Sequence, residues 1–241
     1  MLQPRSPRAD HYAAPVSRAR AFHLLTFLVT AFGLVLQLVL VVQGHRVLDE
    51  QHPPDLASRL VRYCSYLTIW ANALVAWSTL TLALGRDRDT RVWRALRLDA
   101  VVLILLAGVV HFFFLRPLLD LHGWDLVADR TLHMVVPALA VVGWLLFGPR
   151  GRVSRDDLGP FLVVPVGWLV YTLVRGALAS WYPYPFIDVD AHGYGPVLLN
   201  CLGVAALTLL FALGAVRLDP RLGRPQRPVP EPVDGNVPKG S

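Results

Sequence analysis

The sequence has little of what secreted domains and duplicated transporters are built from. It contains two cysteines, Cys64 and Cys201, and both lie inside apolar runs, which favours small buried hydrophobic residues over a disulfide. No internal repeat relates the first half of the chain to the second, which disfavours a transporter made of two similar halves. Lysine occurs once, at Lys239, beside many arginines, a bias typical of GC-rich bacterial genomes.

Charge is also scarce over six long stretches, at about 21–43, 58–84, 97–117, 126–147, 158–179 and 196–216. The chain is 54% hydrophobic with a mean hydropathy of +0.47, and each stretch has the roughly 20 residues needed to cross a bilayer. Because the bilayer core offers no water to backbone groups, such segments must be helical. The sequence therefore predicts an all-α integral membrane protein, a six-helix transmembrane bundle with little left for a soluble domain.

The arginines are concentrated on one side of this predicted bundle. They occur in the segment 1–20 and in the connections near 86–97 and 150–155, whereas the other connections are mainly acidic. Cytoplasmic loops collect basic residues, so both termini are expected in the cytoplasm, with the protein in a bacterial cytoplasmic membrane. No small-residue cleavage site follows the first run, which predicts a retained helix and not a signal peptide.

Three regions follow from this layout: a basic cytoplasmic segment at 1–20, the transmembrane domain at 21–216, and a tail at 217–241. The tail is rich in proline and poor in apolar residues, so it is expected to be disordered and cytoplasmic. The net charge of +6 comes from the cytoplasmic loops and tails and suits anionic lipid headgroups. Membrane lipids are the expected partners, and a nucleic-acid partner is not needed to explain the charge.

Polar side chains inside the predicted helices gather toward the outer surface. Helices alternate in direction, so sequence position gives depth: about 15 Å for Thr68, 10 Å for His133, 9 Å for His111, and 6 to 8 Å for Arg175 and Asn200. The inner half of the bilayer is expected to hold no comparable group of polar side chains. Because intramembrane polar residues usually face the bundle interior or a wet cavity, a polar cavity opening outward is predicted.

Three helices each carry a polar stripe on one face. The stripes are Ser65, Thr68 and Asn72; Arg130, His133 and Pro137; and Tyr171 with Arg175. Pro137 cannot donate to the carbonyl of His133, so a kink is expected beside the histidine. The segment "SWYPYPFIDVDAHGYGP", which contains Tyr184, is expected to cap the outer mouth, either as an aromatic belt or as a substrate gate.

Thr68 and His133 are the candidate catalytic pair. A hydroxyl becomes a nucleophile when a neighbouring base takes its proton, and histidine suits neutral pH. An acyl-enzyme through Thr68 would follow, with Asn72, Arg175 or a backbone N–H stabilising the oxyanion. The competing interpretation is structural: Thr68 bonds the carbonyl of Cys64, and His133 makes an interhelical hydrogen bond.

Two other functions stay open at this point. His111 and His133 could be the axial ligands of a haem in an electron-transfer protein. Alternatively, the cavity could hold or transport a lipid without chemistry. A metal is not required, because the acids that could complete a metal site, Asp120, Asp125 and Asp129, are expected near the surface. Asp188 is a candidate for orienting His133 if the cap folds inward.

The motifs "YLTIWANAL" around Thr68, "DRTLHMVVP" around His133 and "WYPYPFID" at 181–188, in this order within six helices, resemble the androgen-induced membrane proteins and their relatives, including the androgen-dependent regulator of tissue factor pathway inhibitor. The resemblance implies an intramembrane hydrolase of fatty acid esters of hydroxy fatty acids, without a cofactor, in which Thr68 is the nucleophile and His133 the base. Asp129 and Arg130 replace an Asn-His pair of the animal pattern, and Pro137 precedes the family's proline position by one residue. Arg130 could then favour an anionic lipid or a fatty-acid carboxylate.

The expected function is therefore hydrolysis of a lipid ester in the membrane. The residues expected to line the substrate cavity around Thr68 and His133 are Asn72, His111, Arg130, Tyr171, Arg175, Tyr184 and Asn200.

Overall fold

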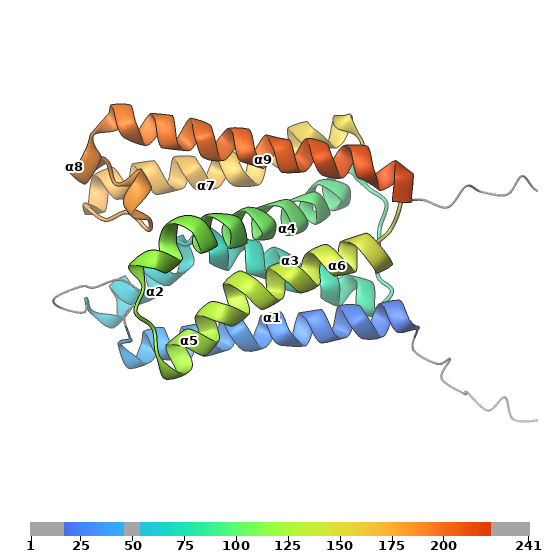
Figure 1. Cartoon of the computed structure of the whole chain (residues 1–241), viewed down its shortest axis with the longest axis horizontal. Coiled ribbons are helices and arrows are strands. Elements are labelled where there is room, and N and C mark those ends of the chain that lie inside the picture. The colour runs from blue at the N-terminus through green and yellow to red at the C-terminus, as the bar shows by residue number, and fades with distance from the viewer. Residues whose placement is uncertain (1–16, 46–53, 223–241) are drawn as a thin grey trace, which may run out of the picture.

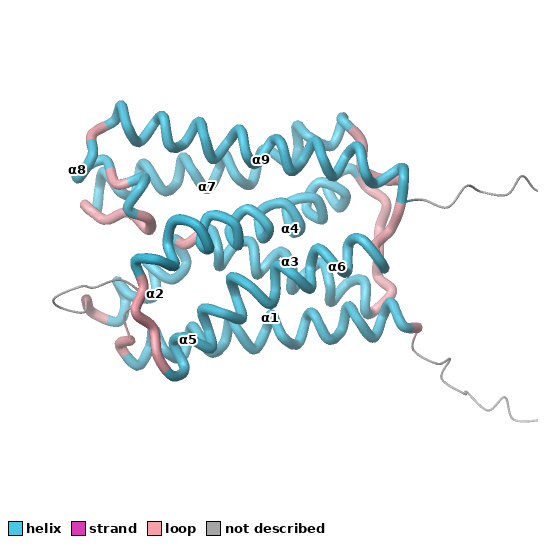
Figure 2. Tube along the Cα trace, in the orientation of Figure 1, coloured by secondary structure: helices cyan, strands magenta, loops and turns pink. Residues whose placement is uncertain are grey.

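The computed structural model describes residues 17–45 and 54–222, which are helical apart from short connections (Figures 1 and 2). The α-helices are α1 (Arg18–Gln43), α2 (Leu56–Ser65), α3 (Leu67–Ala83), α4 (Arg91–Val110), α5 (Gly123–Arg130), α6 (Val136–Phe147), α7 (Leu158–Ala179), α8 (Val189–His192) and α9 (Tyr194–Leu222). Two π-helical turns, η1 (His111–Leu115) and η3 (Thr131–Val135), continue α4 and α5, and 3₁₀ turns occupy η2 (Arg116–Leu118), η4 (Arg155–Asp157) and η5 (Pro185–Ile187).

Several of these helices are long and apolar enough to cross a membrane. Within the described residues they are Arg18–Gln43, Arg91–Leu118, Gly123–Phe147, Arg155–Ala179 and Tyr194–Leu222. Helices α2 and α3 are long and apolar enough only when taken together, and they meet at a bend of 66°, the geometry of a broken span or of a re-entrant loop. The predicted all-helical fold is confirmed for these residues, and its helices are compatible with a membrane bundle of five or six spans.

Helix α4 lies at the centre of the bundle. It contacts α3, α6, α7 and α9, while α1 packs against α3, α5 and α6 (Figure 1). The core between α3, α4 and α6 is made of fully buried residues such as Ala71, Val75, Leu103, Ile104 and Val136. The turn η1 continues α4, and η3, between α5 and α6, contacts α1, α3 and α4.

Gly33 allows α1 to lie directly against η3. A Cβ atom at this position would be 2.8 Å from Leu132 Cδ2 and 2.9 Å from Thr131 Cγ2, both closer than van der Waals contact. Small residues let helix backbones approach closely in membranes, where helix association depends on packing. Gly33 therefore helps to fix the position of the turn that carries His133.

We expect Gly33→Ala to lower the stability of the protein by about 1 to 3 kcal/mol, because the added methyl group overpacks the contact between α1 and η3. Thermal unfolding of the purified protein in detergent measures this. Gly203→Ala is the matched control, since a Cβ atom at Gly203 on α9 would meet no other atom within 4 Å and alanine favours a helix. Equal unfolding temperatures for the two variants would contradict the assigned role of Gly33.

The start of α1 and the end of α9 lie at one end of the bundle, opposite α2, α5 and α8 (Figure 1). Arginines at that end are paired with acids: Arg94 with Asp157 at 3.2 Å, Arg97 with Asp87 at 2.7 Å, and Arg152 with Asp87 at 2.6 Å. The basic loops found in the sequence are thus partly neutralised within the fold.

The boundary of the predicted tail needs a correction, because α9 continues to Leu222. Asp219 is fully buried, and its carboxylate accepts hydrogen bonds from the backbone N–H groups of Arg152 and Val153 at 2.7 and 2.9 Å. This anchor explains why residues 217–222 are helical although the segment has few apolar side chains. Residues 223–241 of the predicted tail and 1–16 of the N-terminal segment lie outside the described residues.

The sequence led us to expect no group of buried polar side chains in the half of the bundle that contains the start of α1 and the end of α9. This expectation is wrong. Toward the start of α1 and the end of α9 the structure buries His23, Thr26, Ser78, Thr79 and Asp99. Hydroxyls here bond carbonyls of their own helix, as Thr26 does with Phe22 at 2.9 Å and Thr79 with Val75 at 2.7 Å. The hydroxyls of Thr26 and Thr79 are satisfied in this way and can be buried at little cost. Asp99 differs, because neither of its carboxylate oxygens has a hydrogen-bond partner among the described residues.

Candidate active site

Thr68 lies just after the break between α2 and α3. Tyr66, between the two helices, is extended (φ −72°, ψ 129°), and Thr68 is the second residue of α3. The first N–H groups of a helix have no intrahelical acceptor. The carbonyl of Cys64, which a continuous helix would offer to Thr68, accepts instead from the indole Nε1 of Trp70 at 2.8 Å. The break thus leaves the Thr68 hydroxyl available to another partner.

His133 is presented by the π-helical turn η3. The N–H of Val136 bonds the carbonyl of Thr131, five residues earlier, and the following residue is Pro137. Pro137 cannot donate to the carbonyl of His133, and Gly108 of α4 packs against this carbonyl and the proline ring. The irregularity expected from the proline therefore takes the form of a π turn, a feature often found at functional sites.

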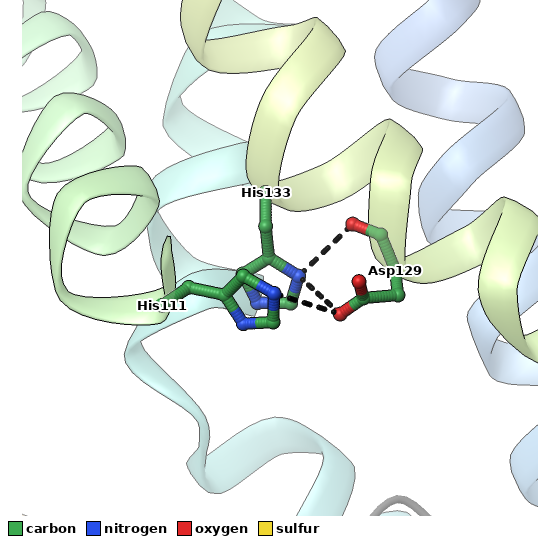
Figure 3. Close-up of side chains that lie close together, drawn as sticks. All are labelled: His111, Asp129 and His133. Carbon is green, nitrogen blue, oxygen red and sulfur yellow. Dashed lines mark hydrogen bonds and ion pairs between the residues drawn. The ribbon is translucent and has the colours of Figure 1, made fainter. Parts of the chain in front are cut away.

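Thr68, His133 and Asp129 form a continuous chain of contacts. His133 Nε2 lies 3.2 Å from Thr68 Oγ1. On the other side of the ring, His133 Nδ1 lies 3.1 Å from both Asp129 Oδ1 and the Asp129 carbonyl oxygen (Figure 3). Thr68 and Asp129 are 5% and 7% exposed, so both residues that contact the imidazole of His133 are shielded from bulk solvent. A hydroxyl, an imidazole and a carboxylate in this order are the elements of a nucleophile–base–acid triad.

His111 completes the group from the second π turn, η1. Its Nε2 lies 3.2 Å from Asp129 Oδ1, and its ring stacks on that of His133 with centroids 3.9 Å apart and an interplanar angle of 14° (Figure 3). The carboxylate of Asp129 therefore faces a nitrogen of each ring. His111 thereby places a ring nitrogen against the carboxylate and covers one face of the His133 ring.

The same three residues have the composition of a metal site, because one ligand atom of each lies within 4.8 Å of the others. Imidazole binds a metal through a lone pair in the plane of its ring. In the structure the nearly parallel rings each place a nitrogen against the same oxygen, Asp129 Oδ1, at 3.2 Å from His111 Nε2 and 3.1 Å from His133 Nδ1. The arrangement favours contacts of both rings with the carboxylate of Asp129.

Ring stacking also speaks against the haem alternative. Two axial ligands of one haem lie on opposite faces of the macrocycle. His111 and His133 stack face to face with centroids 3.9 Å apart, which leaves no space for a porphyrin between them.

A cavity of about 140 Å³ opens onto the group. Thr68, His111, Asp129 and His133 line it, and its apolar wall is formed by Val41, Ile69, Leu115, Leu119, Leu121 and Leu132. The remaining lining includes polar residues, among them His45 and Asp125, which pair at 2.7 Å. Trp181, Pro183 and Tyr184 of the segment predicted to form a cap also line the cavity.

Two of the residues predicted to line the cavity do so, His111 and Tyr184. Asn72 is fully buried behind Thr68, where its side-chain N–H group donates to the Thr68 carbonyl at 2.8 Å and to the Leu132 carbonyl at 3.4 Å. Asn72 thus joins α3 to η3 and positions both catalytic candidates, but it is not among the residues that line the cavity.

The other four predicted residues do not line the cavity: Arg130, Tyr171, Arg175 and Asn200. Arg130 is exposed, because one residue beyond Asp129 a helix has turned by about 100°. Arg175 lies over the ring of Trp181 at 5.0 Å, and Asn200 donates to the carbonyl of Phe186 at 2.8 Å, so both support the cap segment.

Tyr171 and Asp188 also have structural partners. The Tyr171 hydroxyl lies 2.9 Å from Ser65 Oγ, at the end of α2. Asp188, the candidate for orienting His133, instead caps α8: its carboxylate accepts a hydrogen bond from the N–H of Ala191 at 3.0 Å.

Asp129 is the main residue of the site that sequence reasoning missed. It was expected near the surface, but it lies about 9 Å into the helix, six residues after Gly123, and is covered by its neighbours. The signal was present, because Asp129 and His133 are four residues apart and such residues share a helix face.

Comparison of the chain with family models, with curated proteins and with solved structures finds no match in any of the three. Function is therefore inferred from the geometry of the site.

Proposed function

We propose that the protein is an intramembrane hydrolase of lipid esters in which Thr68 is the nucleophile. The observation that carries the proposal is the position of His133, with Nε2 3.2 Å from Thr68 Oγ1 and Nδ1 3.1 Å from Asp129 Oδ1. A carboxylate facing Nδ1 favours the tautomer with its proton there, which leaves Nε2 free to accept the proton of Thr68. The family resemblance assigns the same roles to Thr68 and His133.

In the acylation step, Thr68 Oγ1 forms a bond to the ester carbonyl carbon and its proton passes to His133 Nε2. The carbonyl π electrons move to oxygen and give a tetrahedral oxyanion. When the carbonyl bond re-forms, the bond to the alcohol oxygen breaks. His133 then gives its proton to the departing alcohol, and the acyl group stays on Thr68 as an ester.

In the deacylation step, His133 takes a proton from water while the water oxygen bonds to the acyl carbon. Collapse of this second intermediate breaks the bond to Thr68 Oγ1, which regains a proton from His133. The balance is one ester and one water converted to a carboxylic acid and an alcohol. Asp129 stabilises the imidazolium formed in each step and does not itself become protonated.

The cavity supports a lipid as the substrate. The surface of its lining is mainly apolar, from aliphatic and aromatic side chains, and suits an acyl chain. Besides the group at Thr68, the polar side chains of the lining include Gln37, His45, Arg59, Arg62 and Asp125. In the proposed placement, the start of α1 and the end of α9 face the cytoplasm of a bacterium, and the cavity opens toward the outer leaflet. Membrane lipids are then the source of the substrate.

The proposed function is tested by turnover with a panel of lipid esters. We expect the purified protein, in detergent or lipid nanodiscs, to release fatty acid from at least one long-chain ester, including esters of hydroxy fatty acids. Binding of these esters without release of acid would contradict the hydrolase and leave a lipid-binding protein.

We expect Asp129→Asn to lower kcat by about 10²- to 10⁴-fold with little change in KM, because an amide can donate to Nδ1 and so stabilise the tautomer that cannot accept from Thr68. Asp120→Asn is the control, since the side chain of Asp120 is 97% exposed and lies outside the cavity lining. Steady-state kinetics on the best ester decide the matter, and a kcat for Asp129→Asn equal to that of the control would remove Asp129 from the mechanism.

A further inference from the structure

Tyr184 reaches from the segment between α7 and α8 to the reacting atoms of the proposed hydrolase. Its hydroxyl oxygen lies 3.5 Å from Thr68 Oγ1 and 3.4 Å from the Thr68 backbone nitrogen, and the residue is only 7% exposed. Tyr184 belongs to the cap segment and not to a helix, so its position beside Thr68 depends on the contacts that hold this segment.

The ring of Tyr184 is held on several sides. Phe186 stacks on it with centroids 5.3 Å apart, Tyr66 meets it edge-on at 5.7 Å, and Trp168 lies at 6.0 Å. Trp168 in turn donates to the Ser65 carbonyl at 2.9 Å, which joins α7 to the end of α2. The phenol is therefore packed against the helix break and has little freedom to move away from Thr68.

The hydrogen bonding of this phenol allows its O–H to donate either to Thr68 Oγ1, 3.5 Å away, or to a bound substrate. The N–H of Thr68 donates to the phenol oxygen, and it is among the first N–H groups of α3, which carry the positive end of the helix dipole. Because the oxygen accepts here, its O–H points elsewhere. Burial raises the pKa of Tyr184, so the phenol keeps its proton at neutral pH and acts as a donor.

We propose that Tyr184 donates a hydrogen bond to the oxyanion that forms when Thr68 attacks the ester. This inference rests on the proposed function. The oxyanion is bonded to the same carbon that Oγ1 attacks, so a hydroxyl beside Oγ1 lies beside the oxyanion as well. The N–H of Thr68 donates to the phenol oxygen and so helps to hold Tyr184 in this position. Tyr184 keeps its proton throughout and only stabilises the negative oxygen until the electron pair returns to the carbonyl.

The inference assigns a step-specific role to Tyr184, and this separates it from a residue that only lines the cavity. A wall residue contributes equally to the binding of substrate, product and transition state. An oxyanion donor contributes mainly where the charge develops, so its loss lowers kcat and the affinity for tetrahedral analogues, but not the affinity for a planar fatty acid.

We expect Tyr184→Phe to lower kcat by about 10²- to 10³-fold with KM nearly unchanged, the effect of removing one oxyanion donor. Tyr182→Phe is the matched control, because it removes a hydroxyl from the same segment and Tyr182 is comparably buried, at 8%, but lies outside the cavity lining. The control is expected to keep kcat within about threefold of the wild type.

Binding of a long-chain trifluoromethyl ketone supplies a second readout. Thr68 adds to this ketone and forms a tetrahedral oxyanion. Tyr184→Phe should weaken the ketone about 10²-fold while a fatty acid of equal chain length binds with unchanged affinity. Equal weakening of both ligands would show a structural role only and overturn the inference.

The outcomes also separate this inference from the proposed function. If the wild type hydrolyses esters through Thr68 but Tyr184→Phe keeps kcat within threefold, the oxyanion role is wrong and the hydrolase stands. If the wild type hydrolyses no ester and binds the ketone no more tightly than the fatty acid, both are wrong.

Discussion

Thr68→Ala is expected to lower kcat for ester hydrolysis by about 10⁴- to 10⁶-fold, the range found when a triad nucleophile is removed. The hydroxyl of Thr68 lies 3.2 Å from His133 Nε2, and the carbonyl of Cys64, its ordinary backbone partner in a helix, is taken by Trp70. The measurement is steady-state release of fatty acid by the purified variant. Substrate binding should persist, because the apolar wall of the cavity is unchanged.

Thr79→Ala is the matched control for this variant. Thr79 lies on the same helix and is similarly buried, at 7% against 5% for Thr68, but its hydroxyl bonds the carbonyl of Val75. Each substitution removes one buried hydroxyl and one methyl group, so their effects on folding should be similar while only Thr68→Ala loses activity. Comparable activity losses in the two variants would point to a general packing defect and contradict nucleophilic attack by Thr68.

His133→Gln is expected to lower kcat by a similar factor of about 10⁴ to 10⁶, because an amide cannot take the proton of Thr68 at neutral pH. The matched control is His122→Gln, because the side chain of His122 is 82% exposed and its Nε2 lies 3.8 Å from Asp120 Oδ1. The kcat of His133→Gln should be lower than that of His122→Gln by the full factor of about 10⁴ to 10⁶.

The double variant Thr68→Ala/His133→Gln gives a sharper comparison. Residues that act as one unit in a single step are strongly non-additive, so the double variant should lose little more activity than either single variant. Losses that multiply across the two sites would mean that Thr68 and His133 act in separate steps, which would contradict the proposed proton transfer between them.

The sequence predicted the helical fold well because the strongest signal in a membrane protein is also the simplest. Long runs without charge must be helices in a bilayer, and the apolar runs correspond to the spans that the structure describes. The same logic brought Thr68 and His133 together, since two polar groups at similar depths on different helices are expected to share a cavity.

The break at Tyr66 could not be predicted from local sequence. Neither Gly nor Pro lies in "RYCSYLTIWANAL", and the sequence between 58 and 84 reads as one apolar run. The bend of 66° is instead accompanied by tertiary contacts, such as Trp168 donating to the Ser65 carbonyl and Trp70 donating to the Cys64 carbonyl. The break is what frees the hydroxyl and N–H of Thr68.

The direction in which polar side chains point was predicted less well from the sequence than their depth. Depth placed Arg175 and Asn200 near the mouth, but both direct their polar groups to the cap segment. Asp129 and Arg130 are adjacent in sequence, yet one is buried against two histidines and the other is exposed. Successive residues of a helix are separated by about 100°, so an error of one residue in register exchanges a buried carboxylate, proposed here to act in catalysis, for an exposed arginine.

The most direct test of Thr68 as the nucleophile is to map the adduct formed with a long-chain fluorophosphonate, which reacts irreversibly with activated hydroxyls. After labelling of the purified protein and peptide mass spectrometry, we expect the phosphonyl group on Thr68 in the wild type and no labelling of that peptide in His133→Gln. A protein that hydrolyses lipid esters while its adduct lies on another residue, or while Thr68 is labelled equally without His133, would contradict the Thr68–His133 pair.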